Sequence, residues 1–130
     1  MHADEKRLTE IIIRTSGVNV RKCMKCGKCS ATCPNFAEMD IRPHRFVSMV
    51  EEGDIAALLQ SKSLWRCLSC FACVERCPRG VEPAHLIEAV RMEVVRPQGG
   101  NRLRPEAIPA LLDESIPQQL IVSAFRKYSK

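Results

Sequence analysis

Eight cysteines with regular spacing are the residues of this sequence best suited to chemistry. They form two sets, namely Cys23, Cys26, Cys29 and Cys33, and Cys67, Cys70, Cys73 and Cys77. In each set three cysteines recur at every third position, and the fourth follows after three intervening residues and precedes a proline. Three thiolates on one tight loop can reach three iron corners of a cubane cluster, and a fourth thiolate completes it. The spacing therefore predicts two [4Fe–4S] sites.

Other chemistries of clustered cysteines fit this spacing less well. Zinc sites use Cys-x-x-Cys pairs and need no third cysteine three residues further on. Disulfides belong to oxidising compartments. The N-terminal segment has no apolar run longer than Ile11–Ile13, so it does not read as a signal peptide. No segment has the roughly 18 apolar residues of a spanning helix. We therefore expect a cytoplasmic chain with reduced thiols and no membrane span.

The fourth cysteine of each set is expected to serve the other set. In two-cluster ferredoxins the cysteine before the proline ligates the opposite cluster. We therefore assign the first cluster to Cys23, Cys26, Cys29 and Cys77. The second cluster is assigned to Cys67, Cys70, Cys73 and Cys33. Such an exchange would join the two halves of the chain through their cofactors.

The formal charge does not indicate nucleic-acid binding. The chain has 20 Lys and Arg against 15 Asp and Glu, a net charge of +5. Four thiolates around a cubane core leave about −2 at each site, so two clusters bring the total to about +1. No block of five basic residues occurs. We expect no nucleic-acid partner.

The cysteine loops belong to an internal duplication that is predicted to be helical. Residues 41–47 and 81–87 share an aliphatic-x-Pro-x-x-apolar-aliphatic string after their Cys-Pro steps. Proline suits the first turn of a helix, so Pro43 and Pro83 should each open one. Gly53 should end the first of these helices, and Asp54 should cap a short helix after it. Only residues 18–20 hint at a strand.

The predicted fold class is therefore mainly α, an alpha-helical ferredoxin in which each cluster-binding loop is followed by a helix. We expect an N-terminal helix over residues 1–17 that stops at Gly17, and a dicluster domain over 18–97. Residues 98–130 are interrupted by prolines and end in a basic segment. Pro117 can open a last helix with an apolar stripe, so this tail is expected to dock on a partner.

The two loops differ in their side chains. The first contains several basic residues, namely Arg21, Lys22, Lys25 and Lys28, whereas Leu68, Phe71 and Ala72 accompany the second. We expect a more exposed first cluster, facing a partner with an acidic surface. Trp65 is expected to pack over the second cluster as a shield. His44 and His85 do not align between the repeats, so neither is expected to be a ligand.

No catalytic motif accompanies the cysteines. The sequence has no Gly-x-Gly-x-x-Gly fingerprint and no nucleophile elbow, and every cysteine is assigned to a cluster. We expect no catalytic residue and no small-molecule substrate on this chain, which would act as an electron relay.

With its paired Cys-x-x-Cys-x-x-Cys-x-x-x-Cys-Pro motifs and its helical insert, the chain resembles the small C-type component of heterodisulfide reductases over residues 5–97. The resemblance implies electron transfer from a flavin- and cluster-containing A-type partner to a disulfide-reducing B-type partner. The B-type proteins carry adjacent cysteines, and this sequence has none, so catalysis would lie on another chain. Two alternatives remain, a freely diffusing ferredoxin-type carrier and the relay component of another anaerobic dehydrogenase or reductase.

Overall fold

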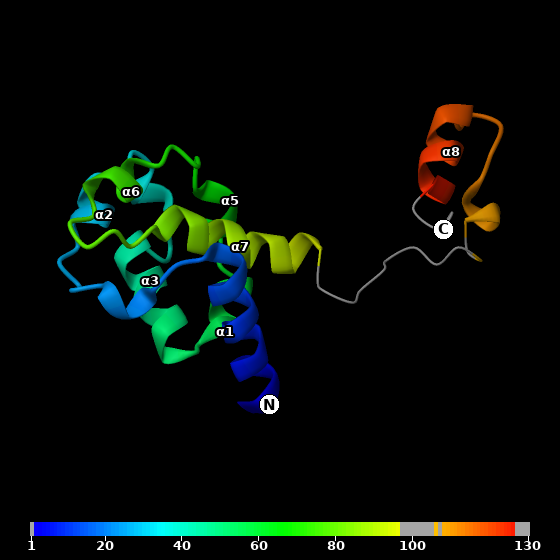
Figure 1. Cartoon of the computed structure of the whole chain (residues 1–130). Helices are drawn as coiled ribbons and strands as arrows, with labels where there is room; N and C mark the ends of the chain where they lie inside the picture. The colour runs from blue at the N-terminus through cyan, green and yellow to red at the C-terminus, as the bar shows by residue number, and fades with distance from the viewer. Residues whose placement is uncertain (1, 97–105, 107, 127–130) are drawn as a thin grey trace. The chain divides into compact units, whose positions relative to one another are not determined.

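The structure is a computed structural model that describes residues 2–96, 106 and 108–126. The chain divides into two compact units, Met1–Pro97 and Gln98–Lys130 (Figure 1). Residues 127–130, in the basic segment that ends the chain, lie outside the described residues.

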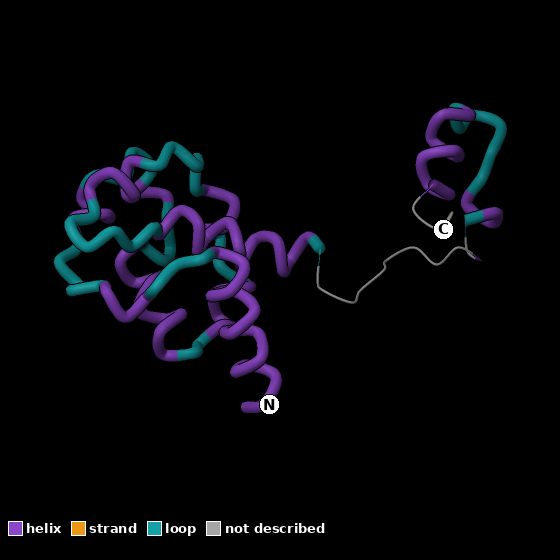
Figure 2. Tube along the Cα trace, viewed as in Figure 1, coloured by secondary structure: helices purple, strands orange, loops and turns teal. Residues whose placement is uncertain are grey.

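The first unit is a set of helices joined by short loops (Figure 2). Its longer helices are α1 (His2–Ser16), α3 (Pro43–Glu52) and α7 (Pro83–Val95). The shorter ones are η1 (Val20–Lys22), α2 (Lys28–Ala31), η2 (Phe36–Glu38), α4 (Ile55–Leu59), α5 (Ser63–Arg66) and α6 (Ala72–Arg76). No strand occurs among the described residues, which confirms the mainly helical fold class.

The helix boundaries follow the expected sequence signals. Pro43 and Pro83 open α3 and α7. Gly17 and Gly53 follow α1 and α3 with φ values of 68° and 83°, a left-handed conformation that glycine adopts without strain. Asp54 stands at the start of α4 as expected, but its side chain makes no capping hydrogen bond, so the predicted cap is wrong in that respect.

The core lies where the three long helices meet α4. Ile12 of α1, Phe46 of α3, Leu58 of α4 and Leu86 of α7 are fully buried. Helix α7 packs on both α1 and α3, and α4 packs on all three. Each such aliphatic or aromatic side chain contributes about 1.5–3 kcal/mol on burial. The core therefore fixes α3 and α7, the two helices that follow the cysteine loops.

Residues 18–20, the only strand candidate, are not a strand. Val18 and Val20 are both buried, but Val20 begins the short helix η1. The side chain of Asn19 accepts a hydrogen bond from the amide of Arg21 at 3.2 Å, which caps this helix. The alternation of apolar residues here reflects packing under a helical turn.

A polar cluster ties the segment before α3 to the start of α5. The carboxylate of Asp40 accepts hydrogen bonds from the hydroxyls of Ser61 and Ser63 at 2.8 and 2.6 Å. It also accepts from the amides of Lys62 and Ser63 at 3.2 and 2.9 Å. Partial burial opposes ionisation, but these donors outweigh it and hold the pKa of Asp40 well below its usual value. This cluster sets where α5 begins, and α5 ends at Arg66, directly before Cys67.

The second unit contains η4 (Pro109–Leu111) and α8 (Gln118–Arg126). The carbonyl of Pro117 accepts a hydrogen bond from the amide of Leu120 at 2.9 Å, and α8 begins at Gln118, directly after the proline that was predicted to open it. Leu120, Val122 and Phe125 are exposed on α8. Leu120 and Phe125 belong to one apolar side of the helix, whereas Val122 lies nearly opposite Leu120, so the unit presents an apolar face around Leu120 and Phe125.

Candidate iron–sulfur sites

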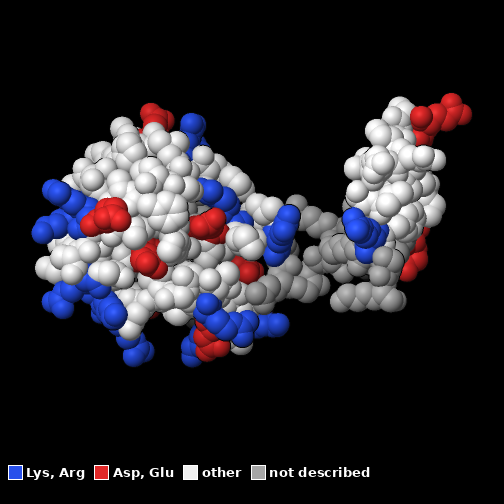
Figure 3. All heavy atoms as spheres, turned by 45° about the horizontal axis from the view of Figure 1, so that its top comes forward, with Lys and Arg blue, Asp and Glu red and all other residues white. Residues whose placement is uncertain are grey.

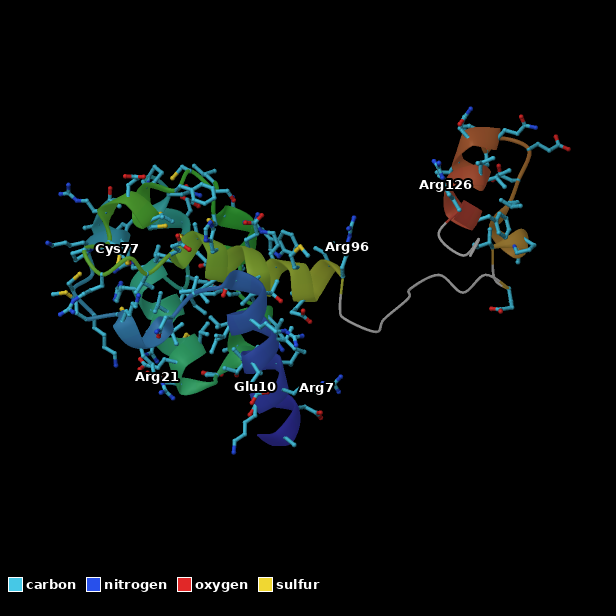
Figure 4. The ribbon with its side chains drawn as sticks, in the orientation of Figure 1. Arg7, Glu10, Arg21, Cys77, Arg96 and Arg126 are labelled. Atoms are coloured by element: carbon cyan, nitrogen blue, oxygen red, sulfur yellow. The ribbon has the colours of Figure 1, made fainter. Side chains whose placement is uncertain are left out.

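Two cavities in the first unit are each lined by four cysteines. Cys23, Cys26, Cys29 and Cys77 line one of them, which we name the first cavity. The first three thiols come from the loop before and within α2, whereas Cys77 closes α6 in the other repeat. Figure 4 marks Cys77 at the end of the unit where α2 and α6 lie. Helices α2 and α6 pack together, which brings the fourth thiol across.

The second cavity has the complementary composition. Its cysteines are Cys67, Cys70, Cys73 and Cys33, so it takes its fourth thiol from the first repeat. The remaining lining is largely equivalent between the cavities. Pro43 and Ile87 stand in the second cavity where Pro83 and Val47 stand in the first. The duplication seen in the sequence is thus a duplication of the sites, with the last cysteine exchanged.

The loops carry the same unusual backbone conformation. Lys25 and Ser69, two residues after the first cysteine of each loop, have φ values of 59° and 52°. Gly27 and Phe71, two residues further on, have φ values of 75° and 63°. Left-handed residues alternating with ordinary ones turn successive amide groups toward one concave side, which suits an anion. A [4Fe–4S] cluster with four thiolates is such an anion.

Two backbone amides point at cysteine sulfurs. The amide of Lys25 donates to Sγ of Cys23 at 3.4 Å, and the amide of Val81 donates to Sγ of Cys77 at 3.3 Å. Hydrogen bonds to sulfur stabilise the thiolate and the reduced cluster. The donor set and its surrounding amides therefore fit an iron–sulfur cluster.

Burial affects the third cysteine of each loop. It raises the pKa of Cys29, and it raises the pKa of Cys73 to about 11. Burial disfavours the charged thiolate, and the neighbouring thiols Cys23 and Cys67 add to the effect. A metal ligand must be deprotonated, so a bound metal cation would favour the thiolate form at these two positions.

The spacing of the thiols suits a cluster better than a single ion. Within the described residues, no three His, Cys, Asp or Glu side chains converge closely enough to hold one metal ion. A cubane instead places each thiolate on a separate iron, so its ligands surround a space. Both four-cysteine cavities have that form.

The surroundings of the cavities correct one expectation. Trp65 does not line the second cavity and is 59% exposed, so the predicted shield over that site is wrong. Leu68 and Phe71 line the cavity instead, and both remain exposed to solvent. Trp65 lies in α5 just before the loop, where its side chain can face outward.

The two histidines have partners of their own. Nδ1 of His44 lies 2.5 Å from the hydroxyl of Ser30, although His44 does line the first cavity. Nδ1 of His85 lies 2.7 Å from the Glu82 carboxylate, and its ring meets Phe71 edge-on. Both sites already contain four cysteines, so neither imidazole is needed as a ligand.

The basic residues of the first loop are exposed. Arg21, Lys22, Lys25 and Lys28 all reach solvent. Figure 3 shows Lys and Arg side chains standing out from the surface of the first unit. Among the cysteines, Cys26 and Cys70 are exposed and only Cys73, at the second cavity, is buried. The cysteines of the first cavity are thus the more accessible set.

Three polar residues that sequence reasoning did not single out anchor the second loop. Nδ2 of Asn35 donates to the carbonyl oxygen of Arg66 at 2.5 Å. Arg91 of α7 donates from Nε to the carbonyl of Leu64 at 2.7 Å and from Nη2 to that of Cys67 at 3.2 Å. Asp40 fixes the start of α5, as described above. Of these three residues, only Arg91 gave a signal in the sequence, because the equivalent position of the first repeat holds the oppositely charged Glu51.

Comparison with known proteins supports the interpretation of these loops. Residues 19–81 match the family described as the 4Fe-4S dicluster domain. Within the described residues, no helix combines the length and apolar character needed to cross a membrane.

Curated relatives are components of heterodisulfide reductases. The chain is 30% identical over 93 residues to the C2 component of the H(2)/formate:CoB-CoM heterodisulfide,ferredoxin reductase of Methanococcus maripaludis, covering 72% of this chain and 49% of that protein. It is 33% identical over 84 residues to the C component of the ferredoxin:CoB-CoM heterodisulfide reductase of Methanosarcina acetivorans, covering 64% and 34%. The chain therefore spans about half or less of the length of these relatives. The expected resemblance is confirmed: the chain carries a 4Fe-4S dicluster domain and is a relative of the C-type components of heterodisulfide reductases.

Proposed function

We propose that this chain is an electron-transfer subunit that carries two [4Fe–4S] clusters within a heterodisulfide-reductase-type complex. The observation that carries the proposal is the pair of cavities, each lined by four cysteines. The first cluster would be held by Cys23, Cys26, Cys29 and Cys77. The second would be held by Cys67, Cys70, Cys73 and Cys33.

When bound, a [4Fe–4S] cluster supplies one-electron chemistry. The residues of this chain contribute ligation, orientation and shielding. The left-handed turns at Lys25 and Ser69 orient backbone amides, and the buried side chains Val47 and Ile87 line the inner walls of the cavities. Fixed donors around a redox centre need little rearrangement when its charge changes, which favours fast electron exchange.

The partners follow from the relatives. Their names describe components of heterodisulfide reductases, so we propose an A-type flavin and iron–sulfur partner as donor and a B-type partner as acceptor. The B-type partner would reduce a disulfide with two electrons and two protons to two thiols. All eight cysteines of this chain line the two cavities, so no thiol is left over for that reaction. Cysteine thiols are kept reduced in the cytoplasm, so we propose that the chain acts there.

Two exposed surfaces, one on the first cysteine loop and one on α8, are suited to docking. The exposed lysines of the first loop favour a partner surface rich in Asp and Glu, because opposite charges speed association. The apolar face of α8, with Leu120 and Phe125, favours a lasting contact over a free carrier. We propose that residues 98–130 dock on a partner protein and that residues 18–97 carry the clusters.

Anaerobic purification of the tagged full chain from its own host tests the proposal. We expect eight iron atoms per chain, flavin in the co-purifying fraction, and a co-purifying protein with adjacent cysteines. A chain recovered alone with eight iron atoms would point to the freely diffusing carrier. A chain containing zinc, or lacking a cubane EPR signal after reduction, would rule out the relay function.

A further inference from the structure

Equivalent positions beside the two cavities carry opposite charges. Helices α3 and α7 both open at a proline, Pro43 and Pro83. Eight residues after the proline, α3 has Glu51 and α7 has Arg91. The two helices line equivalent walls of the first and the second cavity, so the charges occupy matching places in the two repeats.

Arg91 is directed at the backbone of the second loop. Its Nε donates to the carbonyl oxygen of Leu64 at 2.7 Å, and its Nη2 donates to that of Cys67 at 3.2 Å. The side chain is only partly exposed. A guanidinium keeps its positive charge at all physiological pH values. A fixed cation therefore lies against the first cysteine of the second site.

Glu51 interacts with the first loop more weakly than Arg91 interacts with the second. Its Oε2 lies 3.9 Å from Nζ of Lys25, which stands between Cys23 and Cys26. The side chains are 37% and 61% exposed, so water and salt screen this ion pair. The carboxylate thus offsets part of the positive charge of the first loop.

We propose, resting on the proposed function, that the positive charge of Arg91 makes the second cluster easier to reduce. Reduction adds a negative charge, and a nearby cation stabilises the reduced state more than the oxidised one. The partly buried guanidinium is screened less than surface lysines. Glu51 acts in the opposite direction at the first cluster, more weakly because it is exposed. The two repeats thus share the same backbone fold and differ in the charged side chain that shifts the reduction potential of each cluster.

A purely structural role for Arg91 makes a different prediction. The carbonyl groups at the end of a helix lack intrahelical partners, and Arg91 supplies donors to two carbonyls at the end of α5. If that were its whole role, substitution would change stability and leave the potential of the assembled cluster unchanged. The midpoint potential therefore separates the two roles.

The test is an anaerobic redox titration of the full-length loaded chain, followed by EPR and by iron and sulfide analysis. Arg91→Gln removes the charge, and Arg91→Lys retains it. Glu51→Gln is the variant at the equivalent position. Arg96→Gln is a matched control, an exposed arginine at the far end of α7 (Figure 4). Cys70→Ala identifies the signal of the second cluster.

We expect Arg91→Gln to lower the reduction equilibrium constant of the second cluster by up to tenfold, about 59 mV for a one-electron couple. Arg91→Lys should restore most of the difference. Glu51→Gln should raise the first midpoint slightly, and Arg96→Gln should move neither.

Two results would overturn the proposal. One is an unchanged second midpoint in Arg91→Gln with all eight iron atoms present. The other is loss of the second cluster in both Arg91 variants, which would make Arg91 a structural clamp. If Arg91→Gln lost the cluster while Arg91→Lys kept it at the original midpoint, the requirement for charge would be supported. A wild-type chain without two clusters would instead contradict the proposed function itself.

Discussion

Phe71 holds the left-handed backbone conformation that Gly27 holds at the equivalent position of the first repeat, with φ values of 63° and 75°. Each residue directly precedes a short helix, α6 or α2, and lies between the second and third cysteines of its loop. A side chain in this conformation costs about 1–2 kcal/mol. The geometry of the loop is therefore kept even where the residue does not favour it.

The first prediction concerns this conformation. Nothing lies within 4 Å of a Cβ added at Gly27, so Gly27→Ala should add backbone strain alone, about 1 kcal/mol. We expect the loaded protein to lose its visible absorption at a temperature lower by a few degrees. Gly27→Asn should lose less, because asparagine tolerates this conformation. An unchanged transition in Gly27→Ala would contradict the strain argument.

Exchange of the fourth cysteine gives the second prediction. Cys77 lines the first cavity, so Cys77→Ala should damage the cluster assigned to Cys23, Cys26 and Cys29. The other cluster should survive better. Cys33→Ala is the matched variant and should show the reverse pattern. EPR of the reduced proteins, with iron counts, checks both. Selective loss of the second cluster's signal in Cys77→Ala would reverse the assignment.

The third prediction concerns Asp40. Its pKa is lowered by hydrogen bonds from Ser61, Lys62 and Ser63 that outweigh the opposing effect of burial. A carboxylate with a lower pKa in the folded than in the unfolded chain stabilises the fold at pH values above about 4, and this contribution is lost as the pH falls further. Asp40→Asn should therefore cost about 1 kcal/mol at neutral pH, a figure that allows for solvent screening.

Urea unfolding of both proteins at several pH values measures this effect. The difference between wild type and Asp40→Asn should stay constant from about pH 7 to 5 and shrink below about pH 4. Asp54→Asn is the control, because the Asp54 side chain makes no capping hydrogen bond. A difference that grew on acidification would have the wrong sign for this mechanism.

The fourth prediction concerns the apolar face of α8. Leu120 is 58% exposed on the apolar face of α8, so Leu120→Glu should leave the second unit intact while placing a charge on the proposed docking surface. We expect at least tenfold weaker recovery of the partner, with eight iron atoms per chain retained. Gln119→Glu adds the same charge at an exposed polar position on the other side of the same helix. Equal recovery in both variants would remove the docking role.

The local features of this fold were readable from the sequence, and the long-range ones were not. The cysteine spacing, the helix-opening Pro43 and Pro83 and the terminating Gly17 and Gly53 act within a few residues of themselves. The hydrogen bonds of Asp40 reach serines about twenty residues further along the chain. The presence of an aspartate and of serines in a sequence does not indicate that they will contact one another. Trp65 was misplaced for a similar reason, since the direction of a side chain on a four-residue helix depends on its neighbours in space.

The exchange of Cys33 and Cys77 has a consequence for how such a protein can be divided. Neither repeat alone contains four thiols around one cavity, so a chain cut between residues 53 and 54 would yield two fragments with incomplete sites. Two separate copies of one repeat could complete each other only as a two-fold pair, at a rate set by their concentration. Joining them in one polypeptide makes that encounter intramolecular, with an effective concentration of about millimolar. The single chain therefore has the internal symmetry of a dimer of two repeats, and the covalent link between the repeats prevents them from separating.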